Sequence, residues 1–259
     1  MNARGLILAM AILCAGRVGA EVPSGETIVA GLSQSRVSIT ADFVGSEILI
    51  YGAVKRQSPV PTAEPLQVII TVEGPPVEMV VRRKDRVYGI WTNSAEVRID
   101  SAPSFYAIAT TAPLDDILSA TEDLRHRISV PRAIRAVGIS DEADSASQFV
   151  TALVRLREST GSYAIDQGSV RLTEDTLFRA DVALPSNLTE GDYRVRIFLT
   201  RGGRVVDQIE RGIAVRKDGI ERFFFRMAKD QPLVYGILAL LVAGFAGWGA
   251  SAAFRWMRP

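Results

Sequence analysis

The chain has 259 residues, and its 30 Lys and Arg nearly balance 29 Asp and Glu, giving a net charge of +1. This balance excludes the broad basic field that nucleic-acid binding requires, so we expect no nucleic-acid partner. The only cysteine is Cys14 and the only histidine is His126. These counts exclude a disulfide within the chain and the usual zinc ligand sets, so we expect no metal and no cofactor.

Residues 1–20 have the pattern of an export signal. Arg4 supplies a short positive region, and the apolar run that follows is too short to span a bilayer comfortably. Val18, Gly19 and Ala20 are small, or tolerated, at the positions before a signal cleavage site, so we predict cleavage before Glu21. An uncleaved anchor is the alternative, because Arg17 is unusual so close to a cleavage site.

Residues 21–112 predict a first β-sandwich domain. Eight short segments rich in Val, Ile and Tyr are separated by Gly, Pro, Asn and Ser. Short strands at this spacing are typical of an antiparallel sandwich.

Within this region, four cations occupy five consecutive positions: Arg82, Arg83, Lys84 and Arg86. We interpret the flanking residues as two strands of a hairpin with Lys84 and Asp85 at the turn. The cations then crowd one end of the sandwich, where they could contact an anion, lipid phosphates or an acidic partner. The alternative is a hairpin end that charge merely keeps soluble. We assign Tyr88 and Trp91 to the core rather than to a binding platform.

Residues 113–160 predict a helical segment between two β regions. Apolar residues recur at helical spacing, Asp115 and Asp116 lie in a first turn, and Gly161 ends the pattern. His126 lies in a charged stretch of this segment, so we interpret it as a solvated side chain rather than a catalytic base. With no second histidine and no phosphate loop, the sequence offers no catalytic constellation, and we expect no enzyme.

Residues 161–217 predict a second, Ig-like β-sandwich region. Leu188, Gly191 and Tyr193 have the L-x-x-G-x-Y spacing of a tyrosine corner. The expected fold class is therefore mainly β with a helical insert (α+β): two Ig-like antiparallel β-sandwich regions, a helical segment between them and a C-terminal transmembrane helix. The sequence leaves open whether the two β regions form separate domains or one.

Residues 233–254 contain no charged side chain, and about 22 residues of helix rise about 33 Å, enough to cross a hydrocarbon core of about 30 Å. Tyr235 and Trp256 lie near the two ends, where amphipathic rings favour the membrane interface. We predict a transmembrane helix here, with a juxtamembrane segment at 218–232 and a short tail at 255–259.

Small side chains recur at every fourth residue of this span: Ala239, Ala243, Gly247 and Ser251. The spacing lets a second helix approach closely, so it predicts contact with another membrane helix, including self-association. The alternative is that small residues are simply common in membrane helices.

Lys and Arg flank both ends of the span, so local charge does not decide its orientation. We therefore infer the orientation of the span from the export signal. We expect a single-pass protein of a bacterial cytoplasmic membrane, with the bulk of the chain in the periplasm and the C-terminus in the cytoplasm.

Several segments in this order, together with the terminal span, resemble an alphaproteobacterial family of transmembrane proteins: "GLSQSRVSITADFVGSEILIYGA", "GPPVEMVVRRKDRVYGIWTN", "SFYAIATT" and "LFRADVALPSNLTEGDYRVRIFL". The resemblance covers nearly the whole chain after the signal and implies a single-pass membrane protein. It implies no catalytic residues. Members are often encoded near a sulfite-exporter type permease, which makes a polytopic permease a candidate partner.

Two classes of function follow. The first is a membrane-anchored accessory or adaptor protein that docks a permease or another envelope protein. The second is an extracytoplasmic anion-binding protein or hydrolase that uses the basic hairpin end.

Overall fold

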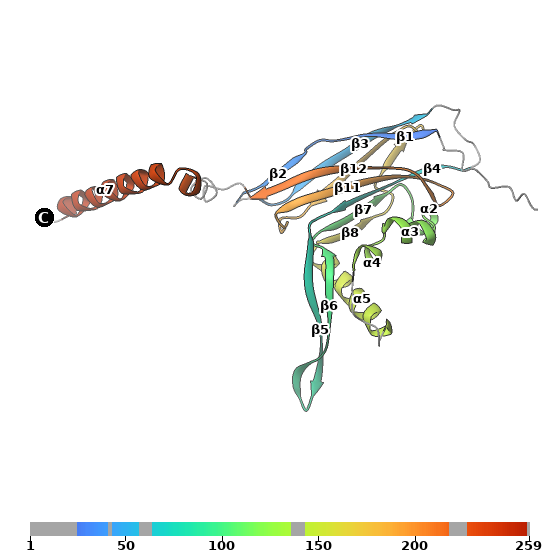
Figure 1. Ribbon diagram of the computed structural model, residues 1–259, viewed down its shortest axis with the longest axis horizontal. Helices are drawn as coiled ribbons and strands as arrows, with labels where there is room; N and C mark the ends of the chain where they lie inside the picture. Colours follow the sequence, from blue (N-terminus) through green and yellow to red (C-terminus); the bar gives the residue numbers. More distant parts are fainter. Residues whose placement is uncertain (1–24, 41–42, 57–63, 136–142, 218–226, 258–259) are drawn as a thin grey trace, which may run out of the picture.

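The computed structural model describes residues 25–40, 43–56, 64–135, 143–217 and 227–257. The predicted signal at 1–20 lies outside the described residues, as do most of the juxtamembrane segment and the last two residues of the tail. Strands dominate, helices are few and an apolar helix lies at the C-terminal end, which confirms the predicted class of a mainly β fold with a helical insert (Figure 1).

Two sheets form the body of the molecule, and each contains strands from both predicted β regions. The four-stranded sheet has the order β1 (Glu26–Leu32), β3 (Ser46–Arg56), β10 (Leu177–Leu184), β9 (Arg171–Thr173). The six-stranded sheet has the order β2 (Arg36–Ile39), β12 (Arg204–Lys217), β11 (Gly191–Arg201), β4 (Leu66–Glu73), β7 (Tyr106–Thr110), β8 (Tyr163–Asp166). The two β regions therefore build one sandwich, which answers the question that the sequence left open.

The six-stranded sheet is covered on both faces. Alternate residues of β4 show this, because Val68 and Ile70 belong to the core between the sheets, whereas Ile69 belongs to a second core. In that second core Ile69 joins Phe198 of β11 and side chains of the helical segment. A strand buried on both faces needs an almost continuous apolar sequence, as β4 has.

Four short or medium helices follow β7 and cover this second face: α2 (Leu114–Ile117), α3 (Ala120–His126), α4 (Val130–Ala133) and α5 (Ala143–Ser159). Ser119 caps α3 by accepting a hydrogen bond from the Glu122 backbone N–H at 3.3 Å. At the other end Arg127 adopts a left-handed conformation, with φ of 51°, and stops the helix.

A long hairpin, β5 (Pro76–Val87) and β6 (Ile90–Pro103), projects from the body (Figure 1). Its base is anchored, since Val97, Ile99 and Ala102 are buried in the second core. Twelve residues in β5 correspond to about 40 Å of strand, so the far end of the hairpin lies well away from that core.

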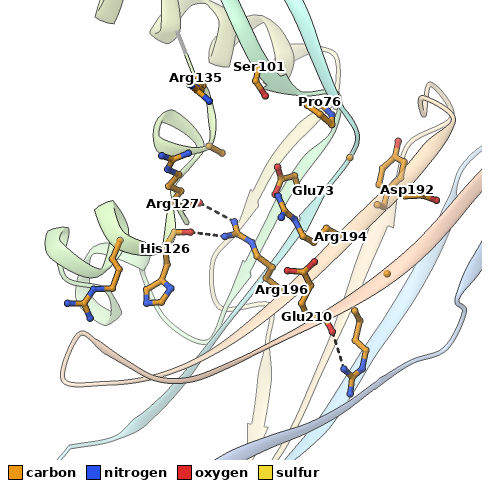
Figure 2. Close-up of a pocket in the computed structure, with 16 residues that line it drawn as sticks. Glu73, Pro76, Ser101, His126, Arg127, Arg135, Asp192, Arg194, Arg196 and Glu210 are labelled. Atoms are coloured by element: carbon orange, nitrogen blue, oxygen red, sulfur yellow. Dashed lines mark hydrogen bonds and ion pairs between the residues drawn. The ribbon is translucent and has the colours of Figure 1, made fainter. Parts of the chain in front are cut away.

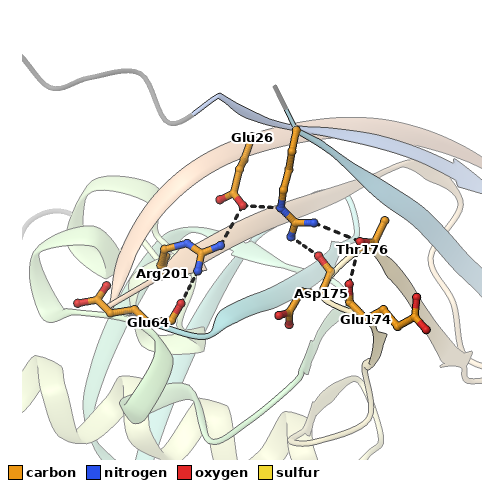
Figure 3. Close-up of polar contacts among 7 residues, drawn as sticks. Glu26, Glu64, Glu174, Asp175, Thr176 and Arg201 are labelled. Atoms are coloured by element: carbon orange, nitrogen blue, oxygen red, sulfur yellow. Dashed lines mark hydrogen bonds and ion pairs between the residues drawn. The ribbon is translucent and has the colours of Figure 1, made fainter. Parts of the chain in front are cut away.

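A buried ion cluster ties the two sheets together at one end of the sandwich (Figure 3). Glu26 of β1 accepts hydrogen bonds from Arg56 of β3 at 2.7 Å and from Arg201 of β11 at 2.9 Å. Arg56 also donates to the Thr176 hydroxyl at 3.1 Å. Because Glu26 and Arg56 belong to the four-stranded sheet and Arg201 belongs to the six-stranded sheet, we interpret the cluster as a structural clamp.

The predicted tyrosine-corner residues lie where the chain crosses from β10 in one sheet to β11 in the other. The Tyr193 hydroxyl donates a hydrogen bond to the Thr189 carbonyl at 2.9 Å, and Leu188 is buried. A Cβ on Gly191 would lie 2.8 Å from Cγ of Pro75, so only glycine fits this position without displacing the ring.

The helix α7 (Pro232–Met257) contains the predicted span. Among the described residues it is the one helix long and apolar enough to cross a membrane. Its 26 residues correspond to about 39 Å of helix, more than the hydrocarbon core requires.

Candidate functional site

The turn of the projecting hairpin lies at Tyr88 and Gly89, whose φ values are 50° and 86°. Two consecutive positive φ values are the signature of a type I′ turn, whose twist matches that of a hairpin. The predicted turn at Lys84 and Asp85 is wrong, because both residues lie within β5 and pair with β6. Gly89 tolerates the left-handed conformation, and neither Lys84 nor Asp85 has a glycine beside it.

Four large apolar side chains are exposed around this turn and form what we call the apex: Val87 at 46%, Tyr88 at 101%, Ile90 at 69% and Trp91 at 66%. The assignment of Tyr88 and Trp91 to the core is therefore wrong. Their strand-like pattern is real, but these positions lie beyond the part of the hairpin that packs on the body. A contiguous apolar group at the end of a projecting element is typical of an interaction site.

Tyr88 is an unusual residue for its position. A type I′ turn favours Asn, Asp or Gly at this point, and a bulky side chain in the left-handed region costs about 1–2 kcal/mol. The side chain is fully exposed, and within the described part of the chain its hydroxyl has no hydrogen-bond partner. Among the described residues neither packing nor hydrogen bonding compensates for the strain, and strained residues of this kind cluster at functional sites.

The four predicted cations lie on β5 just behind the apex, and we call them the collar: Arg82, Arg83, Lys84 and Arg86. Because side chains alternate along a strand, three of them share one face and Arg83 lies on the other. Arg86 pairs directly across the hairpin with Trp91, so cation and indole lie on the same face.

Two acids partly neutralise the collar. Arg82 Nε lies 3.0 Å from Glu96 Oε2, and Arg83 Nε lies 3.4 Å from Asp85 Oδ2. Lys84 has no ion pair among the described residues. The collar thus retains an excess of positive charge next to an apolar apex, although exposed pairs of this kind add little to stability.

A second surface was not anticipated from the sequence. A cleft of about 690 Å³ opens on the outer face of the six-stranded sheet, between β11, β12 and the α3–α4 segment (Figure 2). We call it the arginine cleft, because six arginines line it: Arg125, Arg127, Arg135, Arg194, Arg196 and Arg211.

Arg196 fixes the wall of this cleft. Its guanidinium donates to the His126 carbonyl at 2.7 Å, to the Arg127 carbonyl at 3.1 Å and to the Tyr106 hydroxyl at 3.2 Å. It also lies 5.3 Å from the ring centroid of Phe198. Arg196 therefore satisfies carbonyls left free at the end of α3 and holds that helix against the sheet.

Tyr106 continues this support inside the protein. Its hydroxyl donates to the Ile128 carbonyl at 2.8 Å while it accepts from Arg196. Burial raises the pKa of Tyr106 to about 12, and the neighbouring Arg196 charge opposes that rise only in part. The phenol therefore stays protonated at any physiological pH and keeps its role as a donor.

His126 differs from its expected solvated state. Its side chain is largely buried, its Nε2 lies 3.4 Å from Glu122 Oε2, and its ring meets Phe198 edge to face at 5.7 Å between centroids. The His126 side chain thus packs on Phe198 and has Glu122 as a polar partner, while its backbone carbonyl accepts a hydrogen bond from Arg196.

Two sequence signals for the cleft were present. Arg194 and Arg196 alternate with core residues along β11, and Arg125 and Arg127 flank His126. The two pairs are about 70 positions apart in the chain, and only the tertiary structure brings them to one cleft.

The predicted small-residue stripe lies on α7, and its members are exposed: Ala239, Ala243, Gly247 and Ser251. Helix–helix contact through this stripe stays a prediction, because the structure contains a single chain.

Comparison with known protein families gives a match over most of the chain. The family described as Putative transmembrane protein (Alph_Pro_TM) matches residues 27–256, which is nearly the whole described chain. No curated protein matches the sequence. The match, together with one apolar helix at the C-terminal end, makes this a membrane-anchored protein. The chain belongs to the Alph_Pro_TM family of transmembrane proteins.

Proposed function

We propose that the protein is a non-enzymatic, membrane-anchored adaptor of the bacterial envelope, and that the apex of its hairpin docks a partner protein. The observation that carries the proposal is the apex itself. Four exposed apolar side chains end a projecting hairpin, and one of them, Tyr88, holds a strained backbone conformation. Trp, Tyr and Arg dominate the binding energy of protein interfaces, and the apex and collar supply all three.

The charges of the hairpin define the partner surface. The collar has four cations, and Asp85 and Glu96 are the acids that pair with them, which leaves an excess of two positive charges. A complementary partner offers an apolar pocket for Tyr88 and Trp91, surrounded by acidic side chains. A polytopic permease in the same membrane is our preferred candidate, because the family resemblance suggests one.

We place the adaptor's body in the periplasm and its C-terminus in the cytoplasm, on the basis of the predicted export signal. Alkaline phosphatase is active only outside the cytoplasm. A fusion after Arg216 should therefore be active and a fusion after Pro259 inactive. The opposite pattern would put the hairpin in the cytoplasm and remove periplasmic partners from consideration.

The docking proposal is tested by photo-crosslinking in cells. A benzophenone amino acid replaces Tyr88 in the full chain, and the matched control carries it at Val44, which is 91% exposed elsewhere on the body. We expect position 88 to yield one discrete adduct with a membrane protein and position 44 to yield none. The adduct should weaken when Trp91 is changed to Thr. Equal labelling from both positions would contradict the proposal.

Insertion of the apex into lipid is the competing outcome, because aromatic and basic residues also favour membrane interfaces. The chain has three tryptophans, and two of them, Trp248 and Trp256, belong to α7. Changing both to Phe leaves Trp91 as the only indole in the full chain. Its emission should stay that of a solvated indole when the protein is reconstituted in anionic vesicles alone. A blue shift there would show lipid insertion and overturn the protein-docking proposal.

A further inference from the structure

We infer that the arginine cleft binds a small organic molecule that carries at least two oxyanionic groups, phosphate or carboxylate. The cleft volume of about 690 Å³ lies within the range of about 300–1,000 Å³ that small-molecule sites occupy. Its lining is charged rather than apolar, which favours an ionic ligand. An anion site is thus better supported at the cleft than at the hairpin, whose collar side chains are exposed on a projecting strand.

The arginines lie on two sides of the cleft. Arg127 and Arg135 come from the α3–α4 side of the cleft, and Arg194 and Arg196 come from the sheet (Figure 2). Guanidinium groups match the planar geometry of carboxylate and phosphate oxygens and can donate two parallel hydrogen bonds to each. Arg127 and Arg135 can each bind one anionic group, which favours a ligand that carries two, and Arg196 adds positive charge from the sheet side.

The acids of the cleft do not cancel this charge. Six arginines line the cleft together with three acids, Glu73, Asp192 and Glu210, which leaves an excess of three positive charges. Glu73 is engaged by Arg194 at 2.8 Å, and Asp192 lies 2.5 Å from Arg216, outside the cleft lining. His126 also lines the cleft, and its Nε2 faces Glu122 rather than the opening.

Two arginines are available to a ligand without loss of internal contacts. The side chains of Arg127 and Arg135 are exposed, and within the described residues neither makes a hydrogen bond or an ion pair. Arg127 holds a left-handed conformation, with φ of 51°, that is uncommon for its residue type. Arg196, by contrast, is engaged with backbone carbonyls and acts as a positioning residue.

The inference is tested by titration calorimetry on the full chain in nonionic detergent, at low ionic strength and without phosphate buffer. Pyrophosphate and citrate are the two probes, since they separate a phosphate ligand from a carboxylate ligand. We expect at least one of them to bind, with an affinity that falls as salt is added. Failure of both probes to bind would overturn the inference.

Variants locate the site. Arg127→Asn, which suits a left-handed residue, and Arg135→Gln should each raise the dissociation constant of the bound probe about 10–100-fold, because each removes a charge-assisted contact. Arg171→Gln is the matched control, since Arg171 is an exposed arginine on β9 of the other sheet. Equal weakening by the control would mean diffuse attraction and would contradict a cleft site. Arg211→Gln provides the same test if either cleft variant fails to fold.

Discussion

At the scale of single residues, backbone strain coincides with the surfaces to which we assign function. Four described residues other than glycine have positive φ: Tyr88, Arg127, Glu174 and Asp175. Tyr88 forms the apex and Arg127 lines the arginine cleft. The other two form the turn before β10, where the Asp175 carbonyl accepts a hydrogen bond from Arg56. Strained residues persist where the surrounding structure or a function requires them.

Tyr193→Phe tests the corner between the sheets. The change removes one hydrogen bond, from the Tyr193 hydroxyl to the Thr189 carbonyl, and keeps the buried ring. We expect the free energy of unfolding to fall by about 0.5–1.5 kcal/mol. Urea denaturation in detergent, followed by circular dichroism, measures the change. Tyr51→Phe is the control, because Tyr51 is half exposed, and an equal effect there would contradict a special role for Tyr193.

Glu26 makes stability depend on pH. Burial raises the pKa of Glu26, but hydrogen bonds and charges from Arg56 and Arg201 outweigh it, so the pKa lies below its usual 4.5. The stabilisation is therefore complete above pH 4.5 and is lost as the pH falls through the lower, folded-state pKa. Near neutral pH, Glu26→Gln should lower the free energy of unfolding by about 1.5–3 kcal/mol.

The pH dependence of the same variant tests whether the Glu26 carboxylate stabilises the fold at neutral rather than at acidic pH. The difference in unfolding free energy between the natural chain and Glu26→Gln should stay constant above pH 4.5 and shrink below it. A difference that grows on acidification would show that Glu26 is not held as a carboxylate by the two arginines.

At the scale of elements, the hairpin turn offers a stabilising substitution. Tyr88→Asn places a residue that tolerates the left-handed region at a type I′ position. We expect unchanged or higher stability, by up to about 1 kcal/mol, and slower amide exchange at the end of the hairpin. Hydrogen exchange measured by mass spectrometry checks both hairpin strands. Faster exchange in the variant would mean that the Tyr88 side chain itself stabilises the turn.

The sequence predicted a helix or strand correctly where a single physical signal was strong enough to identify it. The continuous apolar run of β4 and the uncharged span of α7 were both evident. The hairpin turn was not, because four adjacent charges resemble a turn more than Tyr88 and Gly89 do. Burial at Tyr88 and Trp91 was misjudged because a strand pattern does not show where the core beneath it ends.

At the scale of the whole molecule, the sandwich depends on both halves of the chain. β10 lies beside β3 and β11 lies beside β4, and among the described strands β2 pairs only with β12. A fragment of residues 21–112 should therefore stay unfolded, since β2, β3 and β4 would each lack a neighbouring strand that lies later in the chain. Circular dichroism of the isolated fragment checks this expectation. A cooperatively folded fragment would restore the picture of two independent domains.

Pairing between distant strands also limits what the sequence could reveal about function. The arginine cleft lies between α3 and β11, which are separated in the sequence by α4, α5 and β8–β10. No local sequence pattern shows that these two elements lie close together. The collar residues were found because they are adjacent in the sequence. The apex was recognised only when the structure showed that its apolar side chains are exposed.

Cysteine protection tests the docking claim most directly. Cys14 is the only natural cysteine, so a Cys14→Ala background accepts a single reporter thiol, at Tyr88 or at the control position Val44. A membrane-impermeant maleimide is applied to host membranes opened to expose both faces, and again to the same protein purified in detergent. We predict that position 88 reacts at least about tenfold more slowly in the membranes than in detergent, because a bound partner covers the apex. Position 44 should react equally in both. Equal reactivity at position 88 in membranes and in detergent would contradict the claim that the apex is a docked surface.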